Sequence, residues 1–130
     1  MTELPPRRSA FRLFVWFLVP VLVYVAIIFA LSAQADLSAP LGFDNADKLL
    51  HMLEYGVLGF LLSRALRATA RIRRALWVAL IVVAVGSLIG MSDEIFQSFV
   101  PGRDSSVEDW LADFTGLLFA QFIYLLFTHD

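Results

Sequence analysis

One short stretch of the sequence carries several side chains that could do acid–base chemistry. Asp47, His51, Glu54 and Tyr55 recur at spacings of three and four residues. At about 100° per residue, these spacings place the four side chains on one face of a helix. A histidine beside carboxylates can move a proton near neutral pH, or it can ligate a metal ion. Lys48 lies next to this face and adds a cation that could hold an anion.

A second polar group lies farther along the chain, at the end of an apolar stretch. Asp93 and Gln97 fall on one helical stripe, with Glu94 beside them. Gly86 and Gly90 continue the same stripe, and small residues four apart let two membrane helices approach closely. The pattern predicts a helix that packs tightly at its middle and carries carboxylates at its end.

A polar loop leads from this helix into a third group. Ser105 and Glu108 match a capping box, which predicts that a helix opens there, with free backbone amides beside Arg103. Such a corner favours an anion. The face of the new helix then carries, in order, Asp109, Asp113, Gly116 and Ala120. We therefore expect close packing between this helix and the one before it.

The same residues also have a purely structural interpretation. Carboxylates at helix ends are ordinary interfacial groups, and Tyr55 suits the aromatic belt of a membrane interface. Glu54 and Asp113 differ, because each lies a turn or more inside an apolar helix, where an ionisable side chain is costly unless paired. The structural alternative is a buried network with Lys48 or Arg103 that only locks the helices together.

The elements that must position these groups are long apolar helices. Of the 130 residues, 59% are hydrophobic and 17% are charged, and a soluble fold this small could not bury so much apolar surface. A bilayer core needs roughly 20 helical residues to cross it. The stretches of suitable length are 13–31, 49–66, 75–91 and 110–128. We predict one all-α membrane domain over residues 1–130, a bundle of four transmembrane helices. The absence of Cys excludes thiol catalysis and zinc–thiolate sites.

The first apolar stretch has two further features. Pro20 lies inside it and is expected to disturb the helix. Residues 32–35 resemble a signal-peptide cleavage site, but the apolar run before them exceeds the usual length of about 7–15 residues. We therefore expect a retained membrane helix.

The basic residues predict an orientation. Those before the first helix and between the second and third are Arg7, Arg8, Arg12, Arg64, Arg67, Arg71, Arg73 and Arg74. The other two connections hold only Lys48 and Arg103. By the positive-inside rule, both termini are cytoplasmic. The polar groups then form a pocket at the extracytoplasmic end of a multipass protein in the bacterial plasma (inner) membrane.

Taken together, the polar residues resemble the VanZ-like family of small bacterial membrane proteins. The matching positions are Asp47, Lys48, His51, Glu54, Tyr55, Leu58 and Gly59, followed by Asp93, Glu94, Gln97, Phe99, Pro101, Gly102, Arg103, Ser106, Asp109, Asp113 and Gly116. They cover roughly the last two-thirds of the chain. The resemblance implies a four-helix plasma-membrane protein, and the family's namesake is associated with low-level resistance to the glycopeptide teicoplanin. At the final acidic position, many relatives have Asn.

Three functions fit these residues. The first is binding or modifying an anionic cell-envelope molecule, such as a lipid-linked phosphate or a wall precursor. The residues expected to bind it are Lys48, Tyr55, Gln97, Arg103, Ser106 and Asp109. The residues expected to act as acids and bases are His51, Glu54, Asp93, Glu94 and Asp113.

The second function is a metal-dependent membrane hydrolase. The carboxylates suit Mg²⁺, Mn²⁺ or Ca²⁺, and His51 would also suit Zn²⁺. It ranks second because the sequence contains no established metal-ligand motif. The third is a non-catalytic scaffold. The sequence therefore does not decide whether the protein is an enzyme. The expected partners are membrane lipids and a lipid-linked envelope precursor, without nucleic acid.

Overall fold

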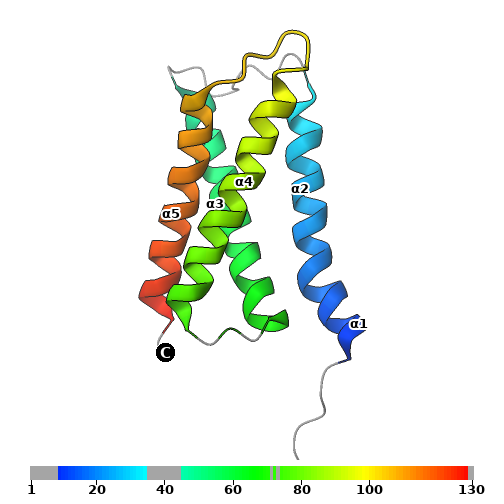
Figure 1. Ribbon diagram of the computed structural model, residues 1–130, viewed down its shortest axis with the longest axis vertical. Coiled ribbons are helices and arrows are strands. Elements are labelled where there is room, and N and C mark those ends of the chain that lie inside the picture. The colour runs from blue at the N-terminus through cyan, green and yellow to red at the C-terminus, as the bar shows by residue number, and fades with distance from the viewer. Residues whose placement is uncertain (1–8, 35–44, 71, 73, 129–130) are drawn as a thin grey trace, which may run out of the picture.

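The computed structural model describes residues 9–34, 45–70, 72 and 74–128, and this part of the chain is all-α (Figure 1). Its elements are α1 (Ala10–Leu13), the π-helical turn η1 (Phe14–Leu18), α2 (Val19–Ser32), α3 (Ala46–Thr69), α4 (Ala75–Gln97) and α5 (Val107–Phe127). The first three form one continuous rod, so four helices are long and apolar enough to cross a membrane. The predicted all-α architecture with four spans is confirmed.

Three helices extend beyond the apolar stretches that predict them, at the ends that carry polar residues. α3 begins at Ala46 rather than 49, α4 continues to Gln97 rather than 91, and α5 begins at Val107 rather than 110. Hydropathy finds only the apolar part of a helix, whereas carboxylates in a first turn favour a helix N-terminus through its dipole. Asp47 in α3 and Asp109 in α5 occupy such positions.

The cap of α5 differs from the prediction. Ser106, not Ser105, is the N-cap, and its hydroxyl accepts the N–H of Asp109 at 3.0 Å. The backbone N–H of Ser106 donates to the Glu94 carboxylate at 2.9 Å. The predicted capping box with Glu108 is therefore wrong. A carboxylate from α4 takes the place that a local glutamate would have in such a box.

Pro20 disturbs the first helix in the turn just before it. Val19 donates its N–H to the carbonyl of Phe14, five residues earlier, which is the hydrogen bond of a π-turn. A proline has no N–H to offer the preceding turn, and its ring crowds that turn. A single wider turn accommodates both effects.

The closest helix pair is α3 and α5, which run side by side in the same direction (Figure 1). A Cβ on Gly116 of α5 would overlap the main-chain carbonyl of Met52 on α3. Farther along, a Cβ on Gly59 would lie 3.0 Å from the Cβ of Ala120. Small residues therefore bring these two backbones together.

The glycines of α4 have a different role from the one predicted. A side chain on Gly86 would meet the Leu117 side chain, and one on Gly90 would meet Asp113 and Tyr55. These glycines make room for side chains of α3 and α5 rather than for a neighbouring backbone. The expected packing of α4 against α5 is present, but Gly86 and Gly90 contact side chains of α5, whereas Gly116 faces the backbone of α3.

The bundle has two chemically different ends. The acidic end is where α2 and α4 finish and α3 and α5 begin. The basic end is the opposite one, and it carries Arg12, Arg64, Arg67 and Arg74. Between them lies an apolar core, whose fully buried members include Leu58, Val78, Val82 and Leu117.

Candidate functional site

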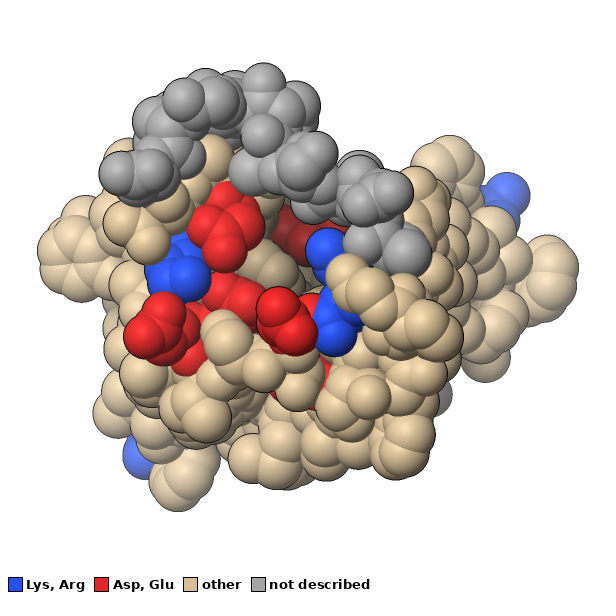
Figure 2. Space-filling view, turned by 90° about the horizontal axis from the view of Figure 1, so that it is seen from above, with Lys and Arg blue, Asp and Glu red and all other residues tan. Residues whose placement is uncertain are grey.

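Charged side chains crowd the acidic end of the bundle (Figure 2). The described carboxylates there are Asp47, Glu54, Asp93, Glu94, Asp104, Glu108, Asp109 and Asp113. The described lysine and arginine there are Lys48 and Arg103. Carboxylates thus outnumber fixed cations, and several of the carboxylates are buried. Such a surplus is costly unless protons or a bound cation offset it.

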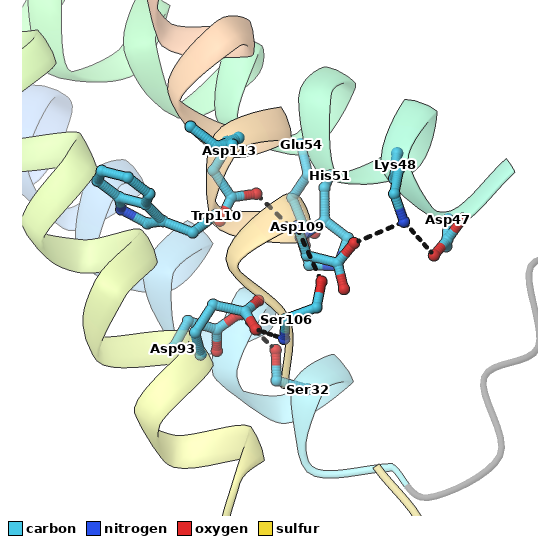
Figure 3. Close-up of polar contacts among 12 residues, drawn as sticks. Ser32, Asp47, Lys48, His51, Glu54, Asp93, Ser106, Asp109, Trp110 and Asp113 are labelled. Carbon is cyan, nitrogen blue, oxygen red and sulfur yellow. Dashed lines mark hydrogen bonds and ion pairs between the residues drawn. The ribbon is translucent and has the colours of Figure 1, made fainter. Parts of the chain in front are cut away.

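The centre of this cluster is a histidine–carboxylate pair. His51 of α3 and Asp113 of α5 approach to 2.9 Å between Nδ1 and Oδ1 (Figure 3). The Asp113 side chain is fully buried, and 14% of the His51 side chain is exposed. The second oxygen of Asp113 has no hydrogen-bond partner. The pair is positioned by the close packing of α3 on α5 and by the space that Gly90 leaves.

A second buried group links α2 to α4. The Ser32 hydroxyl donates to Oδ2 of Asp93 at 2.8 Å (Figure 3). The Gln97 amide donates to the same oxygen at 3.1 Å and to Ser32 Oγ at 3.2 Å. Oδ1 of Asp93 is buried without a partner. Ser32 was not predicted as a site residue, because it ends an apolar run and begins residues 32–35, which resemble a signal-peptide cleavage site.

Lys48 is held by carboxylates at the surface of the cluster. Its Nζ lies 3.5 Å from Asp47, 3.3 Å from Glu108 and 3.4 Å from Asp109. The Lys48 side chain is 30% exposed and that of Glu108 is 75% exposed, so water screens this group and each pair contributes little to stability. Lys48 therefore balances acidic charge at the rim of the site.

Arg103 has no comparable partner. It lies in the connection between α4 and α5, and it makes no ion pair with any carboxylate in the described residues. Its Nε is buried and has no hydrogen-bond acceptor. A guanidinium in this state can donate to an anion in the fork geometry that carboxylates and phosphates accept.

A cavity of about 370 Å³ lies beside Arg103, between α2 and α3. Its polar lining includes His51, Glu54 and Arg103. Its apolar lining comes from Leu31, Leu50, Leu53 and Val57, all of which are substantially exposed. The cavity therefore combines a charged part with walls that reach the apolar surface.

The predicted site residues do not all face this cavity. Tyr55, predicted to bind the ligand from the same face as His51, does not line the cavity. It is fully buried and its ring packs near Gly90, so the alternative of an interfacial aromatic residue is wrong as well. Its hydroxyl has no hydrogen-bond partner. Asp93 and Gln97 face Ser32, whereas Glu94 and Ser106 contact each other at the start of α5. The residues thus gather at one end in adjoining groups.

Fold and site together describe a small membrane protein with four spans and a buried histidine–carboxylate cluster at one end. The chain belongs to the VanZ/LLP1 family, which it matches over residues 6–128. The match extends the resemblance that the polar residues indicate to nearly the whole chain. No curated protein and no solved structure matches the chain.

Proposed function

We propose that the protein binds an anionic, lipid-linked molecule of the bacterial cell envelope, with Arg103 holding the anion. The observation that carries this proposal is the Arg103 guanidinium beside the cavity between α2 and α3, whose buried Nε has no hydrogen-bond acceptor. A buried donor without an acceptor is costly, and a bound phosphate or carboxylate would supply acceptors. Lys48 is less suited to this role, since three carboxylates already surround it.

The walls of the cavity support a lipid-linked ligand rather than a free anion. Leu31, Leu53 and Val57 line it and are also exposed on the outside of the bundle. In a membrane, that surface meets hydrocarbon, so an apolar tail can follow the wall while its charged head stays near Arg103. Such an amphiphile matches both parts of the cavity.

Chemical modification of the ligand would use the residues beside Arg103. His51 and Glu54 line the same cavity, and both can transfer protons. Asp113 would hold the His51 ring in position and stabilise its protonated form. These residues support acid–base chemistry on a bound head group, and a binding function without chemistry needs only Arg103.

The proposed orientation places this site outside the cytoplasm. Arg12, Arg64, Arg67 and Arg74 lie at the opposite end, and the positive-inside rule assigns such an end to the cytoplasm. The same prediction rests on Arg7, Arg8, Arg71 and Arg73, which lie outside the described residues. Both termini then lie in the cytoplasm, and the protein itself lies in the plasma membrane. A protein that holds a wall precursor there would fit the teicoplanin phenotype of the family's namesake.

The test is binding of a polyprenyl phosphate to purified protein in lipid nanodiscs. Arg103→Ala should weaken binding about 10-fold or more, since a charge-assisted hydrogen bond contributes about 1.5–3 kcal/mol. Arg12→Ala is the matched control, because Arg12 is an exposed arginine at the basic end. It should bind like the unaltered protein. Equal affinity for Arg103→Ala and Arg12→Ala would overturn the proposal, as would equal binding of the uncharged polyprenol.

A further inference from the structure

We infer that His51, Glu94 and Asp109 form a binding site for one divalent transition-metal ion. One possible ligand atom from each residue lies within 4.8 Å of those of the other two. Metal bonds to nitrogen and oxygen are about 2.0–2.2 Å long, so small side-chain rotations bring three such atoms onto one ion. The residues come from α3, α4 and α5, so the packing of the bundle sets the geometry.

An unsatisfied oxygen of Glu94 points to a bound ion, independently of the short distances among the three residues. Glu94 is 8% exposed, and Oε2 accepts the N–H of Ser106. Oε1 is buried and has no hydrogen-bond partner. A buried carboxylate oxygen without a donor is costly, so native structures normally satisfy it. A metal ion would do so, with Ser106 orienting the carboxylate through its other oxygen.

His51 is arranged as metal-binding histidines usually are. Its Nδ1 is engaged with Asp113, which leaves Nε2 as the free ring nitrogen. A carboxylate on one imidazole nitrogen fixes the tautomer and the ring orientation, and it strengthens the other nitrogen as a ligand. Asp113 is therefore a positioning residue for the metal site rather than a ligand.

The donor set favours Zn²⁺ or Mn²⁺ over Mg²⁺ and Ca²⁺. One imidazole with two carboxylates is a mixed nitrogen and oxygen set, whereas Mg²⁺ and Ca²⁺ prefer oxygen alone. The surplus of carboxylates at the acidic end also favours a cation of two charges. Three protein ligands leave a coordination position open, as catalytic metal sites do. The inference does not rest on anion binding by Arg103. With Nε2 on the ion, His51 no longer transfers a proton, so in the metal-bound protein Glu54 would carry any acid–base step on a ligand in the cavity.

The test is a titration of ZnCl₂ and MnCl₂ into chelator-treated protein without a polyhistidine tag. Isothermal calorimetry should give one saturable site per chain, and the ion should raise the melting temperature in detergent. Glu94→Gln retains an acceptor for the Ser106 N–H, and Asp109→Asn is similarly isosteric. Each should weaken metal binding about 10-fold or more and abolish the metal-dependent rise in melting temperature. Glu108→Gln is the control, because Glu108 is exposed and is not one of the proposed ligands.

Two results would overturn the metal site. One is the absence of saturable binding to the unaltered protein. The other is equal affinity in Glu94→Gln, Asp109→Asn and Glu108→Gln, which would indicate adventitious binding at the acidic surface.

Each ligand variant is first checked for its metal-free melting temperature. If both ligand variants are unfolded, Asp113→Asn decides, because a weakened affinity there supports the site and an unchanged affinity removes it. Polyprenyl phosphate binding is measured separately in metal-free protein, so the failure of one proposal is distinguishable from the failure of the other.

Discussion

Nδ1 of His51 and Oδ1 of Asp113 lie 2.9 Å apart, although the two residues are separated by 62 positions in the chain. The contact joins α3 to α5 near the place where Gly116 brings their backbones together. Tight helix packing thus fixes the relative position of the two side chains. The histidine, which the sequence predicts as a centre of chemistry, is held by a fully buried carboxylate on a second membrane helix.

The His51–Asp113 contact leads to a prediction about stability. Asp113→Asn should leave the melting temperature in detergent close to that of the unaltered protein, because an amide oxygen can still accept from Nδ1. Asp113→Ala should destabilise the fold by about 1–3 kcal/mol, since it leaves a buried imidazole nitrogen unpaired. Thermal unfolding of both variants is the measurement. Equal losses would mean that the negative charge, not the hydrogen bond, matters to the fold.

Substitution by alanine should destabilise the fold at Gly116 but should be tolerated at Gly56. A methyl group on Gly116 meets the backbone of Met52, which cannot move aside. Gly116→Ala should therefore cost about 1–3 kcal/mol or more through overpacking. The nearest atom to a Cβ on Gly56 is 3.7 Å away, which is an ordinary contact, so Gly56→Ala should be tolerated. Melting temperature and yield from membranes check both, and a tolerated Gly116→Ala would contradict the close packing of Gly116 on the Met52 backbone.

Arg103 should not be replaceable by lysine. Arg103→Lys keeps the charge but loses the planar fork that binds a phosphate through two hydrogen bonds. We expect polyprenyl phosphate binding to fall in this variant almost as far as in Arg103→Ala. Lys48→Gln should have the smaller effect, because three carboxylates already surround Lys48. Lipid binding in nanodiscs is the readout, and a stronger loss in Lys48→Gln would transfer the anion-binding role to Lys48.

Reporter fusions test the orientation. A reporter that is active only outside the cytoplasm should be active at Ser105 and inactive at Ala70. The reason is that these residues lie in connections at opposite ends of the bundle. A fusion at Ala39, in a connection that lies outside the described residues, should also be active. Activity at Ala70 would place the acidic end in the cytoplasm and exclude an extracytoplasmic ligand.

The sequence predicted the number of spans because hydropathy and length act on each helix separately. It also grouped His51 with Glu54, since helical periodicity decides which side chains share a face. The packing partner of Gly116 was wrong for a physical reason. A small residue indicates that another helix approaches closely. The sequence of its own helix does not show which helix that is.

Tertiary contacts explain the other differences. Ser105 and Ser106 are equivalent as local caps, and the Glu94 carboxylate, which accepts the N–H of Ser106, favours the second. Ser32 carried no signal of its own, since only Asp93 and Gln97 give its hydroxyl a role. Tyr55 has the amphipathic ring of an interfacial residue, but it lies on the face of α3 that α4 and α5 cover.

The unequal packing of the helices makes one wall of the cavity less firmly held than the other. α2 contacts the rest of the bundle more sparsely than α3, α4 and α5 contact one another. In the described residues, the side-chain hydrogen bonds that tie α2 to its neighbours come from Tyr24 and the Ser32 group. The π-turn before Pro20 also interrupts the α-helical hydrogen bonding in the same rod. α2 is therefore the least firmly packed wall of the bundle, and it borders the cavity beside Arg103, whereas the histidine–carboxylate pair belongs to the tightly packed pair α3 and α5.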